Sequence, residues 1–217
     1  MTPTGPKSIS QVALKDMAAG TGVPAEYWRP ITDKNLADWE VHWRPAIDKQ
    51  LAVLNEAGVE RYLWPQSREW DWRKKHNILN AAPGHESAAV VAAGVTQGMM
   101  IADLDFRARI AEQARQHMVY VEFLEVAPWN RKTLTGGMPK YAGIGTLLLG
   151  KAIELSIELG FKGRIGLHSL PQSNDFYANQ CGMSDLGADE KYNKLRYFEM
   201  TPAMAESFLS RGEQRDR

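Results

Sequence analysis

Residues 119–160 read VYVEFLEVAPWNRKTLTGGMPKYAGIGTLLLGKAIELSIELG, and this stretch decides the fold. Its first part, residues 119–127, is rich in β-branched and aromatic side chains and stops at Pro128, which is typical of a strand. After a loop of turn residues, apolar side chains recur every three or four positions from Gly143 to Gly160. That period predicts a helix with one apolar face, ended by Gly160. The unit is a strand, a glycine loop and a helix.

The glycine loop has a physical use as a phosphate site. The first turn of a helix presents unpaired N–H groups and the positive end of the helix dipole, and both attract phosphate. Gly143 and Gly145 have no side chain that would keep a pyrophosphate away from these amides. Glycines at a strand–helix turn are also common as plain turn residues, so their spacing alone is a weak signal.

The longer context resembles the GCN5-related N-acetyltransferase (GNAT) superfamily. The run Lys140-Tyr141-Ala142-Gly143-Ile144-Gly145 is similar to that family's acyl-CoA loop, Arg/Gln-x-x-Gly-x-Gly/Ala, with lysine in the first place. The resemblance implies that the loop amides hold the pyrophosphate of acetyl-CoA and that the end of the preceding strand pairs with its pantetheine arm. The cofactor-binding residues implied in this way are Val126, Lys140, Tyr141, Ala142, Gly143, Ile144, Gly145 and Thr146. Residues 129–139 make a longer connection than is usual in the family, and either shape the acceptor pocket or form an inert surface loop.

The other predicted elements follow the family's order from about residue 27 to 201. They are a short strand ending at Thr32–Asp33, a helix over 36–57 broken at Pro45, a helix over 70–79, a hairpin of 87–93 and 98–104, helical character over 106–116, a strand over 164–170, a short helix over 173–180 and a strand over 195–201. The predicted fold class is α/β, with a GNAT-like mixed, mostly antiparallel central sheet, a parallel strand pair at its centre and flanking helices.

The predicted organisation is one domain with two extensions. Residues 1–24 mix Thr, Gly, Pro and Ala and are expected to form a flexible arm. Residues 25–201 form the acyltransferase domain, and residues 202–217 a surface helix with a charged tail.

Composition limits the classes of partner and cofactor. Lys plus Arg and Asp plus Glu number 26 each, so net charge gives no reason to expect nucleic acid or membrane partners. One cysteine among 217 residues rules out an intramolecular disulfide and a cysteine-built zinc site, and no metal is expected. The first residues lack an apolar signal core, and no apolar run approaches the ~20 residues that span a bilayer, so a cytoplasmic protein is expected.

Amide formation from a thioester requires a neutral amine, a polarised carbonyl and a proton for the departing thiolate. The family takes that proton from a tyrosine within a pattern like Phe/Leu-Tyr-x-x-x-Gly-Phe. Residues 176–183 are similar with one extra residue, which makes Tyr177 the candidate acid. The alternative is that Tyr177 packs beneath the cofactor and donates only a structural hydrogen bond.

Three residues are candidates for the general base. Glu122 and Glu125 lie in a strand otherwise made of apolar and aromatic residues, where a carboxylate needs water, a partner or a cleft. Simple alternation places them on opposite faces, and a bulge in the strand, as is typical of the family, would change this. His168 lies near the end of the next strand. Each has an ordinary alternative, as a rim carboxylate or a hydrogen-bonded core histidine.

The predicted function is acyl-CoA-dependent N-acyl transfer, with acetyl-CoA as the donor and a direct transfer within a ternary complex. The acceptor is an amine on a small molecule, a peptide or a protein, and a homodimer is compatible with this interpretation. One alternative is a non-catalytic acyl-CoA-binding module, which needs the phosphate loop but no acid or base. A nucleotide binder of unrelated fold is disfavoured, because no Gly-Lys-Ser/Thr sequence follows the loop.

Overall fold

The computed structural model describes residues 5–79, 82–131 and 137–215, which fall into two compact units. The first unit is Met1–Ile101 with Leu124–Gly145, and the second is Ala102–Phe123 with Thr146–Arg217. The stretch that decides the fold forms β5 (Val119–Val126) and α5 (Ile144–Glu158), as predicted. Part of the long loop before α5, residues 132–136, lies outside the described residues.

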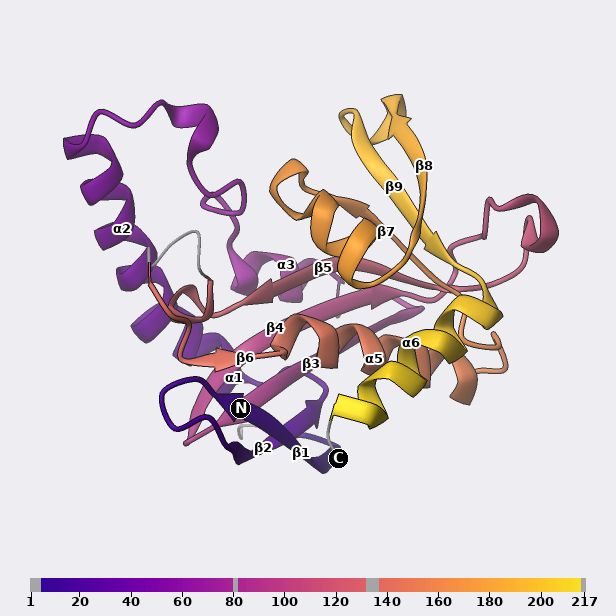
Figure 1. Ribbon diagram of the computed structural model, residues 1–217, viewed down its shortest axis with the longest axis horizontal. Coiled ribbons are helices and arrows are strands. Elements are labelled where there is room, and N and C mark those ends of the chain that lie inside the picture. Colours follow the sequence, from indigo (N-terminus) through magenta and orange to yellow (C-terminus); the bar gives the residue numbers. More distant parts are fainter. Residues whose placement is uncertain (1–4, 80–81, 132–136, 216–217) are drawn as a thin grey trace. The chain divides into compact units, whose positions relative to one another are not determined.

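The first unit opens with a hairpin that corrects the flexible arm predicted over residues 1–24 (Figure 1). Strand β1 (Ser8–Asp16) pairs antiparallel with β2 (Gly22–Arg29) along nearly its whole length. Leu14 is the one buried residue of β1. Backbone pairing on both sides, with β2 and with β6 (Tyr141–Ala142), holds this strand instead of apolar burial, so its sequence carries little strand signal.

The strand order in the first unit is β6-β1-β2-β3-β4. Strands β3 (His85–Ala92) and β4 (Val95–Asp103) are the predicted hairpin, and their turn is at Ala93 and Gly94, which both have positive φ. This turn lies a few residues before the one predicted from the sequence. Nearly every residue of the two strands is buried, which explains their continuous apolar runs.

Three helices of the first unit are α1 (Asp33–Asp38), α2 (Arg44–Glu56) and α3 (Trp72–Leu79). A capping box of Thr32 and Asn35 begins α1. Pro45 lies in the first turn of α2, where its missing N–H would have no helical partner, and a π-helical turn, Trp39–Trp43, precedes it. The buried apolar side chains of these elements are Leu36, Trp39, Trp43, Ile47 and Trp72.

The second unit contains residues 119–123 of β5 and three further strands in the order β5-β7-β9-β8. These strands are β7 (Ile165–Ser169), β8 (Ser184–Asp189) and β9 (Leu195–Met200). Strands β5 and β7 are parallel, as predicted, and the β7–β9 and β8–β9 pairs are antiparallel. Helix α5 buries Leu148, Leu149 and Ile153 completely, and α6 (Pro202–Arg215) is the predicted C-terminal helix.

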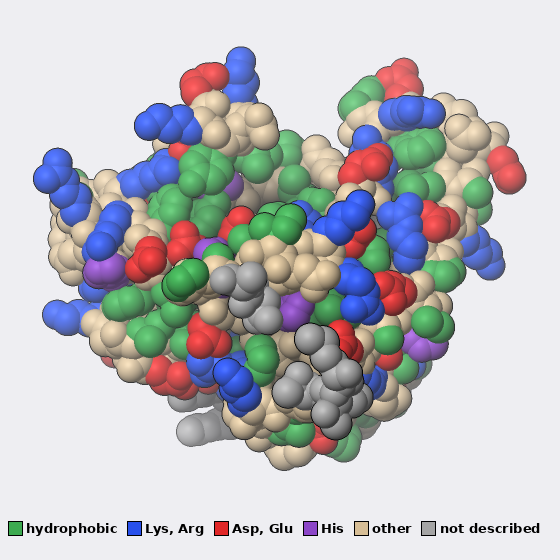
Figure 2. Space-filling model, turned by 180° about the vertical axis from the view of Figure 1, so that it is seen from behind, with side chains coloured by type: hydrophobic (Ala, Val, Ile, Leu, Met, Phe, Trp, Pro, Cys, Tyr) green, Lys and Arg blue, Asp and Glu red, His purple; other side chains and the backbone are tan. Residues whose placement is uncertain are grey.

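The fold is therefore α/β, with a mixed and mostly antiparallel sheet, one parallel strand pair and flanking helices. The helical character predicted over 106–116 is reduced to one 3₁₀ turn, Ala111–Gln113, because tertiary contacts described below hold this segment. None of the helices over the described ranges 5–79, 82–131 and 137–215 is long and apolar enough to cross a membrane. On the face drawn in Figure 2, acidic and basic side chains are interspersed, in keeping with the formal net charge of zero.

Candidate active site

The glycine loop forms a helix N-terminus of the predicted kind. Strand β6 ends at Ala142, Gly143 takes a φ of +84°, and α5 begins at Ile144. A Cβ atom on Gly143 would meet nothing within 4 Å, so the left-handed backbone, and not crowding, is what requires glycine there. The amides of Ile144, Gly145 and Thr146 belong to the first turn, whose N–H groups have no partner within the helix. This loop has the open space and the donors that a pyrophosphate needs.

A chain of hydrogen bonds fixes the backbone before the loop. The Asn130 side chain accepts from the Tyr141 N–H at 2.9 Å and donates to Gln97 Oε1 at 3.0 Å. Gln97 Oε1 also accepts from Trp129 Nε1 at 2.9 Å, and the Lys140 N–H donates to the Trp129 carbonyl at 3.1 Å. Because Gln97 is buried in β4, the segment that leads into the loop is tied to the sheet of the first unit.

Glu125 lies in a buried ion pair. Its side chain bonds with Arg131 and accepts from Trp72 Nε1 at 2.5 Å, and the residue is 4% exposed. Arg131 also donates to the Val126 carbonyl at 2.8 Å and to Ser67 Oγ at 2.9 Å. The predicted pantetheine partner Val126 thus has its carbonyl already bonded to a side chain. The buried Glu125 carboxylate therefore has its counter-charge, Arg131, within the first unit.

In the second unit, the parallel strands pair at Val119↔Ile165 and Tyr120↔Gly166. Among the described residues this pairing goes no further, while β7 continues to Ser169 alongside β9. His168 lies on this continuation and faces the same side of the sheet as Tyr120, since Gly166 and His168 are two positions apart on one strand. The two strands therefore part where the candidate base is found.

Both ring nitrogens of His168 have partners. Nδ1 is 2.7 Å from the Tyr120 hydroxyl, and Nε2 is 3.1 Å from Asp189 Oδ2. Asp189 Oδ2 also accepts from Arg109 Nη1 at 2.5 Å. The Tyr192 ring stacks on the imidazole with centroids 3.7 Å apart. Burial, the largest effect, lowers the pKa of His168, and the hydrogen bond with Asp189 opposes it.

Glu122 lies two residues after Tyr120 on the same face of β5 and is half-buried. Its charge adds to the effect of burial in raising the pKa of Tyr120, and it contributes in the same direction at Tyr192. The structure therefore places Glu122 and His168, two of the predicted bases, on either side of Tyr120.

Tyr177 lies on the other face of this strand layer. It belongs to a π-helical turn, Phe176–Gln180, and its ring packs against Phe198 at 5.9 Å between centroids. Phe198 follows Tyr197, whose ring is 4.9 Å from that of His168, and successive strand residues point to opposite faces. Burial raises the pKa of Tyr177, which keeps its hydroxyl protonated, as a proton donor must be.

The residues around His168 that sequence reasoning missed include Arg109, Tyr120, Asp189 and Tyr192. Tyr120 was visible as the aromatic residue two positions before Glu122, on the same face of a strand. Arg109 and Asp189 reach His168 from segments 59 positions before it and 21 positions after it, and nothing in their local sequence marks them. No group of three His, Cys, Asp or Glu side chains able to hold a metal ion occurs in the described part of the chain.

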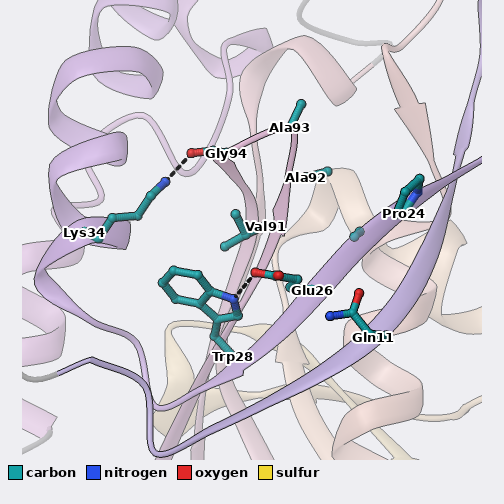
Figure 3. A pocket seen from close by; sticks show the side chains of 10 residues that line it. Gln11, Pro24, Glu26, Trp28, Lys34, Val91, Ala92, Ala93 and Gly94 are labelled. Carbon is teal, nitrogen blue, oxygen red and sulfur yellow. Dashed lines mark hydrogen bonds between the residues drawn. The ribbon is translucent and has the colours of Figure 1, made fainter.

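The first unit has a pocket of about 390 Å³ between β1, β2, β3 and Lys34 (Figure 3). Trp28 Nε1 donates to Glu26 Oε2 at 2.8 Å there, and Lys34 bonds with Asp38 and the Gly94 carbonyl. The charged groups of the pocket are thus paired within it. None of the predicted site residues lines it, so it is no part of the predicted site.

Comparison with known proteins finds no matching family model and no match among curated proteins. Solved structures do match. A GNAT-family acetyltransferase from Listeria monocytogenes 4b F2365 superimposes with a TM-score of 0.50 at 13% identity, over 88% of this chain and 99% of that one. The GNAT domain of S. lividans PAT gives a TM-score of 0.50 at 13% identity, over 88% and 96%. The chain therefore has the fold of the GCN5-related N-acetyltransferase superfamily.

Proposed function

We propose that this protein transfers an acyl group, acetyl in the first instance, from a CoA thioester directly to an amine. The observation that carries this proposal is the loop at Gly143, an open helix N-terminus within a fold shared with acetyltransferases. Backbone amides and a helix dipole suit the pyrophosphate of CoA. Lys140, whose Nζ lies 5.1 Å from the centre of the Tyr141 ring, adds a positive charge beside them.

The reaction assigns two tasks to side chains of this chain: removing a proton from the attacking amine and giving one to the leaving sulfur. Tyr177 is proposed as the donor because residues 176–183 resemble the family's tyrosine pattern. For the acceptor of the amine proton, Glu122 and His168 remain proposals. Glu125 is assigned a structural part, because both of its oxygens are already bonded inside the first unit.

Replacing Gly145 with Asp tests the phosphate loop. A carboxylate in the first turn of α5 interacts favourably with the helix dipole, so the protein should stay folded. Negative charge at the phosphate site should weaken CoA binding at least about tenfold. Gly22→Asp is the matched control, since a side chain there meets nothing within 4 Å and Gly22 lies at the start of β2. Calorimetric titration with CoA measures both. Wild-type protein that does not bind CoA, or a Gly145→Asp variant that binds it equally well, contradicts the proposal.

The second candidate is an acyl-CoA-binding module without turnover. The arrangement around His168 favours the enzyme, because a binding module has no use for an ionised aspartate, a histidine and a tyrosine bonded in sequence. Incubating the protein with acetyl-CoA and a panel of amines, a lysine peptide and a polyamine included, and weighing the products by mass spectrometry separates the two. CoA binding with no acylated product from any amine would support the module.

A further inference from the structure

We propose that Asp189, His168 and Tyr120 form a proton relay, and that the Tyr120 hydroxyl receives the proton of the attacking amine. The inference rests on the proposed acyl transfer and names the route by which its base acts. It differs from the expectation that His168 meets the amine directly, because the ring nitrogen that could accept a proton is already bonded to Tyr120.

The protonation states follow from Asp189. Its Oδ2 accepts from Arg109 and lies 3.1 Å from His168 Nε2, and its Oδ1 accepts from the Lys191 N–H at 2.9 Å. The hydrogen bond from Arg109, the largest effect, lowers the pKa of Asp189 to about 2, so Asp189 is ionised at neutral pH and can only accept. His168 must then carry its proton on Nε2. Nδ1 is left as an acceptor, and the Tyr120 O–H donates to it.

Two further contacts hold the relay in place. Arg109 is fixed through its backbone, because its N–H donates to Glu199 at 2.8 Å. Glu199 is fully buried and also accepts from the Ile110 N–H and the Tyr197 hydroxyl. The guanidinium of Arg109 lies 4.2 Å from the centre of the Tyr197 ring, which adds a cation–π contact. The positive charge that keeps Asp189 ionised is therefore anchored within the second unit.

The reactive end of the relay is Tyr120. Its oxygen donates one hydrogen bond to His168 and keeps lone pairs for an incoming N–H. Phe106 stacks on its ring with centroids 4.1 Å apart, so the ring cannot swing away from His168 without losing this contact. Glu122 lies on the same face of β5 and adds negative charge that attracts an amine in its cationic form.

The proton balance of the step is as follows. The amine nitrogen forms a bond to the acyl carbon, its proton passes to Tyr120 Oη, and the Tyr120 proton passes to His168 Nδ1. The imidazolium that results keeps its Nε2–H bond to Asp189, which stabilises its charge. The carbon–sulfur bond breaks and CoA leaves as a thiolate, which the relay does not protonate, and His168 returns the proton it gained to solvent to complete the cycle. Asp189 and Arg109 act by positioning and charge, without exchanging a proton.

The first test needs no turnover. Nitrogen-15 NMR of the full chain reports the tautomer of each histidine, and His168→Gln identifies the signal of His168. At neutral pH His168 should carry its proton on Nε2. Tyr120→Phe removes a hydrogen bond that favours the neutral ring and should raise the pKa of His168. Tyr62→Phe removes an exposed phenolic hydroxyl of the first unit and should leave that pKa where it is. An Nδ1–H tautomer, or a pKa unmoved by Tyr120→Phe, overturns the relay.

The second test measures CoA release from acetyl-CoA, with a lysine peptide, spermidine or water as acceptor, across pH. Tyr120→Phe and Asp189→Asn should each lower kcat roughly 10²–10³-fold at unchanged CoA affinity. They should also remove the rise of kcat/KM that follows deprotonation of His168, while Tyr62→Phe keeps it. Wild-type protein that fails to bind CoA overturns the acyltransferase proposal and the relay together. Binding without turnover of any of the three acceptors also overturns both and favours a binding module, whereas full turnover by Tyr120→Phe overturns the relay alone.

Discussion

Glu125→Gln distinguishes a structural carboxylate from a catalytic one. Glutamine has nearly the same shape and keeps an oxygen that can accept from Trp72 Nε1, but it removes the negative charge beside Arg131. The two side chains are buried to different extents, with 3% of Glu125 and 16% of Arg131 exposed. The variant therefore leaves a largely buried guanidinium without its counter-charge.

The magnitude follows from this geometry. Removing one partner of a buried ion pair costs about 3–5 kcal/mol, most of it from the charge left unpaired. The loss should be at the low end, about 3 kcal/mol, because the variant retains the bond from Trp72. Arg131 also keeps its bonds to Ser67 and the Val126 carbonyl. In a chain of this size each kcal/mol lowers Tm by about 2–4 °C, so Tm should fall by about 6–12 °C.

Urea denaturation followed by tryptophan fluorescence measures the free energy of unfolding, and turnover is then expressed per folded molecule. Glu122→Gln on the same strand is the matched control and should change stability by under about 1 kcal/mol, because its half-buried side chain is screened by water. Removing both partners, with Glu125→Gln and Arg131→Gln combined, should restore part of the loss. An unchanged Tm together with lost turnover in a protein that still binds CoA would refute this reasoning and make Glu125 the base.

Three further outcomes are expected. Gly143→Val should weaken CoA binding and lower Tm, because its φ of +84° is strained for a β-branched residue even though the space beside it is open; equal binding measured by calorimetry contradicts this. Tyr177→Phe should keep CoA affinity and lower kcat roughly 10²–10⁴-fold, and an unchanged rate would leave Tyr177 a packing residue. Burial lowers the pKa of His76 and His168 below the ordinary 6.5. Between the lowered pKa and pH 6.5, the unfolded chain therefore binds more protons than the folded chain. The free energy of unfolding, measured in urea, should therefore be highest above pH 6.5 and fall as the pH is lowered below it. This pH dependence should weaken when both histidines are replaced by glutamine.

The parts of the fold that were predicted correctly have local signals. The period of α5 and the apolar runs of β3 and β4 come from burial that repeats along one element, which the sequence records directly. The segments that were missed gain their structure from partners. Strand β1 exposes most of its residues and exists through pairing with its neighbours, and β8, read SDLGAD, has no fully buried residue and pairs with β9. An edge strand without an apolar face has no periodic signal to read.

The same distinction separates the parts of the candidate site. The candidate phosphate loop is one continuous run, and the positive φ of Gly143 is a local reason for glycine there, so the sequence predicts the loop as a unit. The residues around His168 come from separate segments. Residues 106–116 are rich in helix-forming residues, which predicted a helix where the structure has a loop with one 3₁₀ turn. Those residues fold instead as a loop in which Glu199 accepts from the backbone of Arg109 and Ile110, whereas a helix over 106–116 would use the Ile110 N–H for its own hydrogen bond.

The loop that replaces the predicted helix over residues 106–116 affects the protonation of His168. In the predicted helix the N–H of Ile110 would bond to the carbonyl of Phe106, so Glu199 could not hold this segment through two amides and thereby fix Arg109. Bonded to Glu199, it is held where its charge keeps Asp189 ionised, and an ionised Asp189 sets the tautomer of His168. A buried carboxylate that takes no part in proton transfer thus decides which nitrogen of the imidazole carries the proton. Glu199→Gln should therefore alter the His168 tautomer measured by NMR while leaving CoA binding intact, and a tautomer unchanged in a folded variant would show that Arg109 needs no such anchor.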